Sequence, residues 1–159
     1  MSAFLSERWV RVFVTELAGA PAMTLRGGDA LDEYRQAPVY DAYLDRVTDA
    51  YLERYCAGLS YLDAASWRHY LPSYAEYALR DRAQSHLGID AFLNTLRPPD
   101  RDPPRLASLS AEQEGLIREM LEVLAFSSDS AYQVEACQVL EEWWIENPLY
   151  RNPSSNRDE

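Results

Sequence analysis

Four acidic residues recur at four-residue spacing in the first third of the chain: Asp41, Asp45, Asp49 and Glu53. In an α-helix, side chains at this spacing lie along one face, so the spacing predicts a row of carboxylates, here called the acid ladder. Carboxylates in this arrangement can share a hard cation, but bundle sites of that kind add a Glu-x-x-His motif, which this chain lacks. The ladder is otherwise a solvated helix face or, with Tyr40 beside it, a surface that meets positive charge on a partner.

A second group of residues could bind a small ligand. Aromatic, cationic and imidazole side chains lie close together in the middle of the chain, at Trp67, Arg68, His69, Tyr70, Tyr74 and Tyr77. In a pocket, His69 or Tyr70 would act as acid or base and Arg68 would hold an anion. The alternative is a packed helix, because apolar and aromatic residues recur from Trp67 to Ala78 at the three- and four-residue intervals of a helix core.

Metal-binding and nucleophilic motifs are absent from the sequence. The four candidate soft ligands, Cys56, Cys137, His69 and His86, form no CxxC or HxxxH pair. The chain also lacks a GxSxG elbow, a glycine-rich phosphate loop and an HExxH motif. The sequence therefore predicts no metal and no cofactor, and it favours a non-enzymatic role. Two cysteines without a motif are typical of a reduced cytoplasmic protein, although a disulfide between them stays open.

The net charge of the chain indicates which classes of partner it could bind. The chain of 159 residues has 15 basic and 26 acidic residues, for a formal net charge of -11. Nucleic acids and anionic membranes both require positive protein charge, so the sequence argues against either partner and favours a basic protein. No apolar stretch reaches the roughly 20 residues that a membrane span needs.

Helical periodicity and capping residues define the elements that would position these groups. Apolar residues at three- and four-residue spacing predict helices over 3–17, 30–36, 40–57, 64–71 with a continuation after Pro72, 88–96, 111–126 and 131–146. Asp29 and Asp63 are the predicted N-caps of two of them, and Gly58 is the predicted C-terminal cap of the 40–57 helix. Capping boxes are predicted at Ser110 with Gln113 and at Ser130 with Gln133.

These elements predict an all-α fold. Residues 1–150 are expected to form one domain, a bundle of about six or seven helices that ends in a helical hairpin. The proline-rich stretch 97–105 is expected to be an extended surface loop. Residues 151–159 are polar and are predicted to be a disordered tail.

The stretch Trp67-Arg68-His69-Tyr70-Leu71-Pro72-Ser73-Tyr74 has an aromatic-Arg-x-Tyr-Leu-Pro-x-aromatic pattern, preceded by a turn with Leu59 and Leu62. It resembles the signature of a family of small, uncharacterised bacterial helical proteins. The similarity extends more weakly back to Tyr43 and forward through 109–144. The resemblance implies no activity and transfers no catalytic residue, and the acid ladder is not part of it.

The sequence thus supports three hypotheses about function. The first is an acidic protein-binding module of the bacterial cytoplasm, such as an immunity protein or antitoxin-type inhibitor that occupies a basic surface. The second is a small-ligand-binding protein or an enzyme of unknown reaction that uses the segment 67–77. The third is self-association through Trp143, Trp144 and Tyr150.

Overall fold

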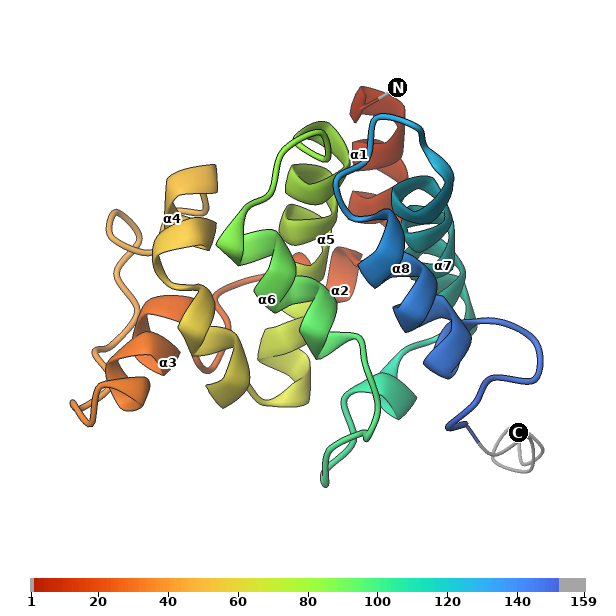
Figure 1. Cartoon of the computed structure of the whole chain (residues 1–159). Helices are drawn as coiled ribbons and strands as arrows, with labels where there is room; N and C mark the ends of the chain where they lie inside the picture. Colours follow the sequence, from red (N-terminus) through yellow and green to blue (C-terminus); the bar gives the residue numbers. More distant parts are fainter. Residues whose placement is uncertain (1, 152–159) are drawn as a thin grey trace.

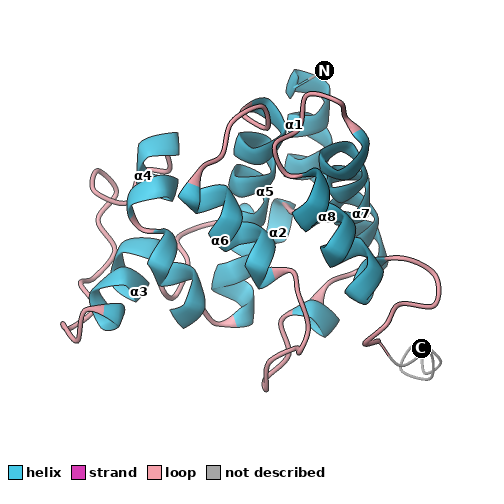
Figure 2. Ribbon diagram, viewed as in Figure 1, coloured by secondary structure: helices cyan, strands magenta, loops and turns pink. Residues whose placement is uncertain are grey.

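The described part of the chain is helical throughout. The computed structural model describes residues 2–151, with the side chains of 7–151, and no strand occurs among them (Figure 1, Figure 2). The α-helices are α1 (Ser2–Val12), α2 (Val14–Leu17), α3 (Leu25–Asp32), α4 (Asp49–Arg54), α5 (Ala64–Arg80), α6 (Leu87–Thr95), α7 (Ala111–Phe126) and α8 (Gln133–Val139). Two 3₁₀ helices, η1 (Cys56–Tyr61) and η2 (Leu106–Ser108), and a π-helical segment, η3 (Leu140–Trp144), complete the list. The all-α prediction is confirmed, whereas the predicted tail lies outside the described residues except for Arg151.

Helix α5 is the central element. Its first turn is closed by Asp63, whose carboxylate accepts a hydrogen bond from the Ser66 N–H, so this predicted N-cap is confirmed. Pro72 lies inside the helix without ending it, and the helix continues to Arg80. Helices α1, α2, α6 and α7 all pack against α5 (Figure 1).

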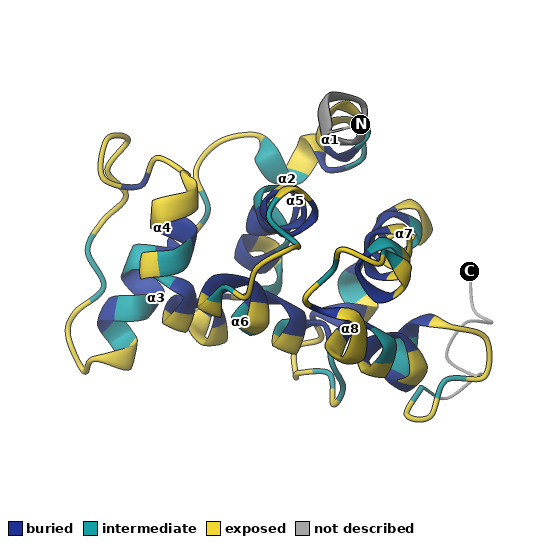
Figure 3. Cartoon of the chain, turned by 45° about the horizontal axis from the view of Figure 1, so that its top comes forward, coloured by how far each residue is buried: buried dark blue, intermediate teal, exposed yellow. Residues whose placement is uncertain are grey.

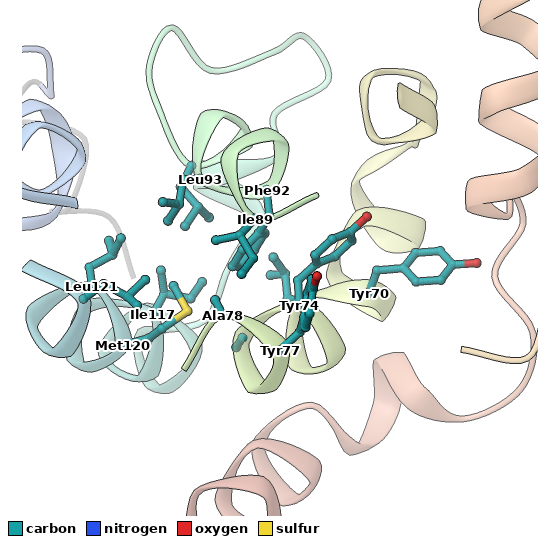
Figure 4. Packing of buried hydrophobic residues seen from close by; sticks show 14 of the residues in the cluster. Tyr70, Tyr74, Tyr77, Ala78, Ile89, Phe92, Leu93, Ile117, Met120 and Leu121 are labelled. Carbon is teal, nitrogen blue, oxygen red and sulfur yellow. The ribbon is translucent and has the colours of Figure 1, made fainter. Parts of the chain in front are cut away.

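A single hydrophobic cluster joins the elements. It extends from Trp9 in α1, through α5 and α6, to Trp144 in η3. Figure 4 shows Tyr74 of α5 beside Phe92 of α6, and the two rings are stacked with centroids 5.2 Å apart. The buried α5 positions follow the helical period from Trp67 to Ala78, which confirms the core interpretation of that spacing.

The C-terminal hairpin is also confirmed. Ser110 and Gln113 form both hydrogen bonds of the predicted capping box, so α7 begins where the sequence indicates, and α8 packs against it. The second predicted capping box is wrong. Ser130 Oγ accepts from the Tyr132 N–H, and the Gln133 amide donates to the Ser127 carbonyl instead of reaching back to residue 130.

Two boundaries near the N-terminus differ from the prediction. The helix predicted over 3–17 is interrupted at Phe13, which separates α1 from α2. Helix α3 begins at Leu25, four residues before the predicted cap Asp29, because the Thr24 hydroxyl accepts from the Gly27 N–H and supplies the N-cap.

The helix predicted over 40–57 is wrong over most of its length. Residues 33–48 contain no helix, and α4 begins only at Asp49, where the Thr48 hydroxyl accepts from the Tyr51 N–H. Gly58 is not a C-terminal cap either, because it lies inside η1. The extended loop predicted over 97–105 is present, and a short helical turn, η2, follows it.

Gly58 has a different role, at the crossing of η1 and α3. The backbone of Gly58 touches that of Gly28, and a Cβ atom on Gly58 would overlap the Leu25 carbonyl oxygen. A Cβ on Gly28 would in turn overlap the Gly58 carbonyl oxygen. Glycine at both positions therefore lets α3 and η1 pack backbone against backbone, which fixes the position of α3 and of the loop that follows it.

Candidate functional site

The segment between α3 and α4, residues 33–48 and here called the 33–48 loop, is long and is held to the fold by one buried carboxylate. Asp45 lies in the middle of its second half and is 4% exposed. Most of the remaining loop is exposed (Figure 3). A loop of this length without helix or strand is uncommon in a small domain, and such loops often carry function.

Asp45 is bound from both flanking helices. Arg26 of α3 donates from Nε to Oδ1 at 3.0 Å and from Nη2 to Oδ2 at 2.9 Å. Tyr51 of α4 donates its hydroxyl to Oδ1 at 2.9 Å. Arg26 Nη2 also donates to the carbonyl of Val39, so the same guanidinium holds the loop at two points.

The protonation of Asp45 follows from these contacts. Burial by itself would raise the pKa of this carboxyl, but hydrogen bonds from Arg26, the Asp41 N–H and Tyr51 outweigh it and hold the pKa below its ordinary value. Burial raises the pKa of the Tyr51 hydroxyl, which therefore stays a donor. At neutral pH the group is an ion pair with its lone pairs satisfied.

Asp41 closes a turn within the loop. Its Oδ1 accepts from the N–H groups of Tyr43 and Leu44, and its carbonyl accepts from the Asp45 N–H at 2.8 Å. A carboxylate that bonds backbone N–H groups two and three residues ahead replaces helical hydrogen bonds with a local cap. Asp41 and Asp45 together thus give the loop a defined conformation.

This conformation presents apolar side chains to solvent. Val39 is 86% exposed and Tyr43 is 80% exposed, and three neighbours are partly or largely exposed. We call the five residues the loop patch: Val39, Tyr40, Tyr43, Leu44 and Val47. Several apolar side chains gathered on one ordered loop are a common property of binding surfaces.

The acid ladder does not form one helix face. Asp49 pairs with Arg80 of α5, and Glu53 accepts from the Tyr77 hydroxyl at 2.7 Å and from the Gly88 N–H at 3.0 Å. With Asp41 and Asp45 used inside the loop, each of the four carboxylates has a partner within the chain. The prediction of a continuous acidic row is wrong, because the segment that carries its first half is not helical.

The residues predicted to line a pocket at 67–77 are mainly core residues. Trp67, Tyr70 and Tyr74 are buried, and the Tyr74 hydroxyl donates to the Leu52 carbonyl at 2.9 Å. The Tyr70 hydroxyl accepts from the Leu25 N–H. These side chains therefore join α5 to the segments on either side of the 33–48 loop.

Arg68 and His69 lie on another side of α5, toward α2. Arg68 donates to Ser108 Oγ at 2.6 Å and pairs with Glu16 at 3.5 Å. His69 Nδ1 lies 2.8 Å from the Glu16 carbonyl oxygen, so this nitrogen carries the proton. Both side chains fasten α2 to α5. The His69 ring also packs edge-to-face against the Tyr70 ring, with centroids 4.9 Å apart, so the two rings are in contact and enclose no pocket between them.

The C-terminal aromatic residues differ in their exposure. Trp144 is buried and its indole donates to the Leu96 carbonyl at 2.9 Å, so it is not at the surface where a contact between copies would need it. Trp143 is half-buried with the Arg151 guanidinium over its ring, and Tyr150 is exposed.

The remaining sequence expectations concern metals, thiols and membranes. Within residues 2–151, no three His, Cys, Asp or Glu side chains are grouped as a metal site would need. Cys56 and Cys137 are free thiols, and the structure contains no disulfide between them. None of the described helices is long and apolar enough to cross a bilayer.

The fold and the site define an all-helical protein with an ordered, aromatic-rich surface loop. Residues 5–148 match the family of unknown function DUF6714, and the chain belongs to that family. The resemblance to an uncharacterised family is thereby confirmed. No curated protein and no solved structure shows significant similarity to the chain.

Proposed function

We propose that this protein is an acidic protein-binding module and that the loop patch is its contact surface. The observation that carries the proposal is the exposure of Val39, Tyr40, Tyr43, Leu44 and Val47 on a loop that Asp45 holds in place. Tyrosine supplies a large contact area with few rotatable bonds, and an ordered loop loses little entropy on binding.

Charge supports a basic partner. The chain has a net charge of -11, and residues 25–54, which include α3, the loop and α4, contain seven acids against four arginines. A negative surface around an apolar patch steers a positively charged partner into contact and leaves the apolar anchors to hold it. The partner expected here is a protein whose binding site is an apolar depression with a basic rim.

An inhibitor of the immunity or antitoxin type, acting in the bacterial cytoplasm, would have this chemistry. Such a protein occupies a basic functional surface of its target, and tight binding needs a few buried anchors inside the charged contact. Tyr43 and Val39 are the proposed anchors because they are the most exposed members of the loop patch.

The experiment compares three forms of the full chain as baits in a native lysate at low and moderate salt. They are the wild type, a Val39→Ser and Tyr43→Ser double variant, and a Phe126→Ser and Val134→Ser control whose exposed apolar residues lie on α7 and α8. Each retained protein is then purified and titrated against all three forms.

The proposal expects a basic protein that binds the wild type and the control equally and whose association slows with added salt. Loss of two anchors should weaken its binding at least about tenfold. If every retained protein binds the loop variant as tightly as the wild type, the loop patch is not the contact surface and the proposal fails.

A further inference from the structure

A cavity of about 660 Å³ opens between η1, α6 and the segment 97–106, and none of its lining residues belongs to the 33–48 loop. Figure 1 shows this segment leaving α6 and descending beside the start of α5 before it turns toward α7. The cavity has the size of a small-molecule site. Its lining departs from the rest of this acidic chain, because it contains three arginines, Arg97, Arg101 and Arg105, and one acid, Asp100.

Arg105 is a buried cation without a carboxylate partner. The residue is 4% exposed, and it donates from Nε and Nη2 to the carbonyls of Leu59 and Leu62, with the shortest distances at 2.6 Å. These bonds fix the plane of the guanidinium at the end of η1. Nη1 makes no hydrogen bond to any described residue. A buried guanidinium is normally paired with an anion, whereas this one has two neutral carbonyl oxygens and the ring of Trp67, whose centroid lies 5.9 Å from the guanidinium carbon.

The electrostatic state of Arg105 reflects the missing counter-charge. Burial, followed by repulsion from Arg101, lowers the pKa of the guanidinium to about 10, although Asp63 and Asp100 attract the charge. The guanidinium remains protonated at neutral pH, at a cost that a bound anion would offset.

Of the other charged residues in the lining, two have charged or hydrogen-bonding partners within the chain, and one has no ion pair within the part of the chain that the structure describes. The Asp100 carboxylate accepts from the N–H groups of Arg101, Arg105, Leu106 and Ala107, so it holds the loop closed. Arg97 is held by Glu142 in a bidentate pair, with the shorter contact at 2.6 Å. Arg101 is exposed at the rim and has no ion pair with any described residue.

Neutral donors and apolar surface complete the cavity. Asn94 and Ser60 line it, and neither side chain has a hydrogen-bond partner within residues 2–151. Leu87 and Ala91 of α6 and Pro98 of the segment 97–106 supply apolar surface. A ligand that matches this lining has an anionic group that contacts the arginines and an apolar group that contacts the apolar residues.

We propose that this cavity binds a small organic anion, with a carboxylate or phosphate group between Arg105 and Arg101 and an apolar part against Leu87, Ala91 and Pro98. Guanidinium groups bind both kinds of anion through paired N–H donors. Asn94 and Ser60 are the positions from which additional hydrogen bonds reach the anion. The site is independent of the loop patch.

The test is an NMR titration of the ¹⁵N-labelled full chain with phenyl phosphate, with benzoate, and with benzyl alcohol as the uncharged analogue. At least one anion should produce saturable shifts at the amides of Ser60, Asn94 and Arg101, with a Kd of about 1 mM or tighter for a fragment of this size. Saturation by phenyl phosphate alone identifies a phosphate site, and saturation by benzoate alone a carboxylate site. Benzyl alcohol should not saturate.

Two variants distinguish binding of the anion at this cavity from a general effect of positive charge on the protein. Arg101→Gln should weaken binding of the anion about tenfold without changing the melting temperature, because the Arg101 side chain is exposed. Arg118→Gln, which removes an exposed arginine from α7, is the matched control and should bind as the wild type does. Arg105 is unsuitable for this test, since its loss would leave the Leu62 carbonyl without its donor and would remove one of the two donors to the Leu59 carbonyl.

Two results would overturn the proposal. One is the absence of saturable shifts at the cavity with both anions. The other is an Arg101→Gln variant that binds the anion with wild-type affinity.

Discussion

Arg26 and Asp45 form a bidentate ion pair that joins α3 to the second half of the 33–48 loop, with N–O distances of 3.0 and 2.9 Å. The Asp45 side chain is fully buried and that of Arg26 is 17% exposed. Tyr51 adds a third donor from α4, so one carboxylate links three segments of the chain.

Asp45→Ala should lower the free energy of unfolding by about 2–3 kcal/mol, since it leaves a partly buried guanidinium and the Tyr51 hydroxyl without their acceptor. Urea denaturation followed by circular dichroism measures the loss. The control is Glu33→Ala, which breaks the exposed pair with Arg35 and should cost less than about 1 kcal/mol. Equal effects of the two substitutions would show that the Asp45 network contributes no more than a surface ion pair.

The same carboxylate should make stability depend on pH. Its pKa is lower in the folded protein than in the unfolded chain, so its contribution is complete above the unfolded pKa of about 4 and is lost as pH falls through the folded pKa. The difference in unfolding free energy between wild type and Asp45→Asn should therefore shrink from pH 7 to about pH 3.

Asp29 provides a control for the pH dependence, because its pKa is shifted in the opposite direction to that of Asp45. Burial, with a smaller contribution from Glu33, raises the pKa of its carboxyl, so ionisation of Asp29 opposes folding at neutral pH. Asp29→Asn is expected to stabilise the protein at pH 7 and to have little effect at acid pH. A stabilising effect that persists unchanged at acid pH would contradict this assignment.

Gly58→Ala should be severely destabilising, by about 3 kcal/mol, because the new Cβ would overlap the Leu25 carbonyl oxygen of α3. Gly115→Ala is the matched substitution, as nothing lies within 4 Å of the Cβ it would add to α7. It should raise the free energy of unfolding by about 0.5–1 kcal/mol through helix propensity. Thermal unfolding of both variants tests the crossing of α3 and η1, and a tolerated alanine at Gly58 would refute it.

Tyr70→Phe should cost about 1 kcal/mol of stability, because the buried Leu25 N–H loses its acceptor. Tyr61→Phe removes an exposed hydroxyl that donates to Asp32, and it should be nearly neutral. Chemical denaturation compares the two variants. A Tyr70→Phe protein as stable as Tyr61→Phe would remove the structural role of this hydroxyl and revive the interpretation of Tyr70 as a ligand-binding group.

The parts of the fold that could be predicted from sequence are those determined by local chemistry. Asp63 and Ser110 cap helices through side-chain bonds to residues three positions ahead, and the apolar period of α5 spans several turns. The helix over 40–57 could not be predicted correctly, because Asp41 bonds nearby N–H groups and Asp45 bonds Arg26, 19 residues away. Four-residue spacing alone does not distinguish a helix face from such contacts.

The candidate sites could be predicted less well from the sequence than the fold could. Four residues of the loop patch, Tyr40, Tyr43, Leu44 and Val47, lie in the segment 40–57 that the apolar period predicts to be a helix, and their exposure follows from the failure of that helix. Arg105 lies in a proline-rich stretch that the sequence places at the surface. Its burial depends on the carbonyls of Leu59 and Leu62, more than 40 residues away, and no local pattern indicates them.

The Asp41 and Asp45 hydrogen bonds also determine how the loop exchanges its amide protons. The N–H groups of Asp41, Tyr43 and Leu44 are bonded to carboxylates, and the Asp45 carboxylate is held by Arg26 and Tyr51 from two helices. These amides can reach solvent deuterium only when the carboxylates release them, and Asp45 is released when α3 and α4 separate. The Asp41 amide is thus expected to exchange in the same opening event as the helices, whereas the Tyr43 and Leu44 amides, which are bonded to the exposed carboxylate of Asp41, need only a local opening of the loop.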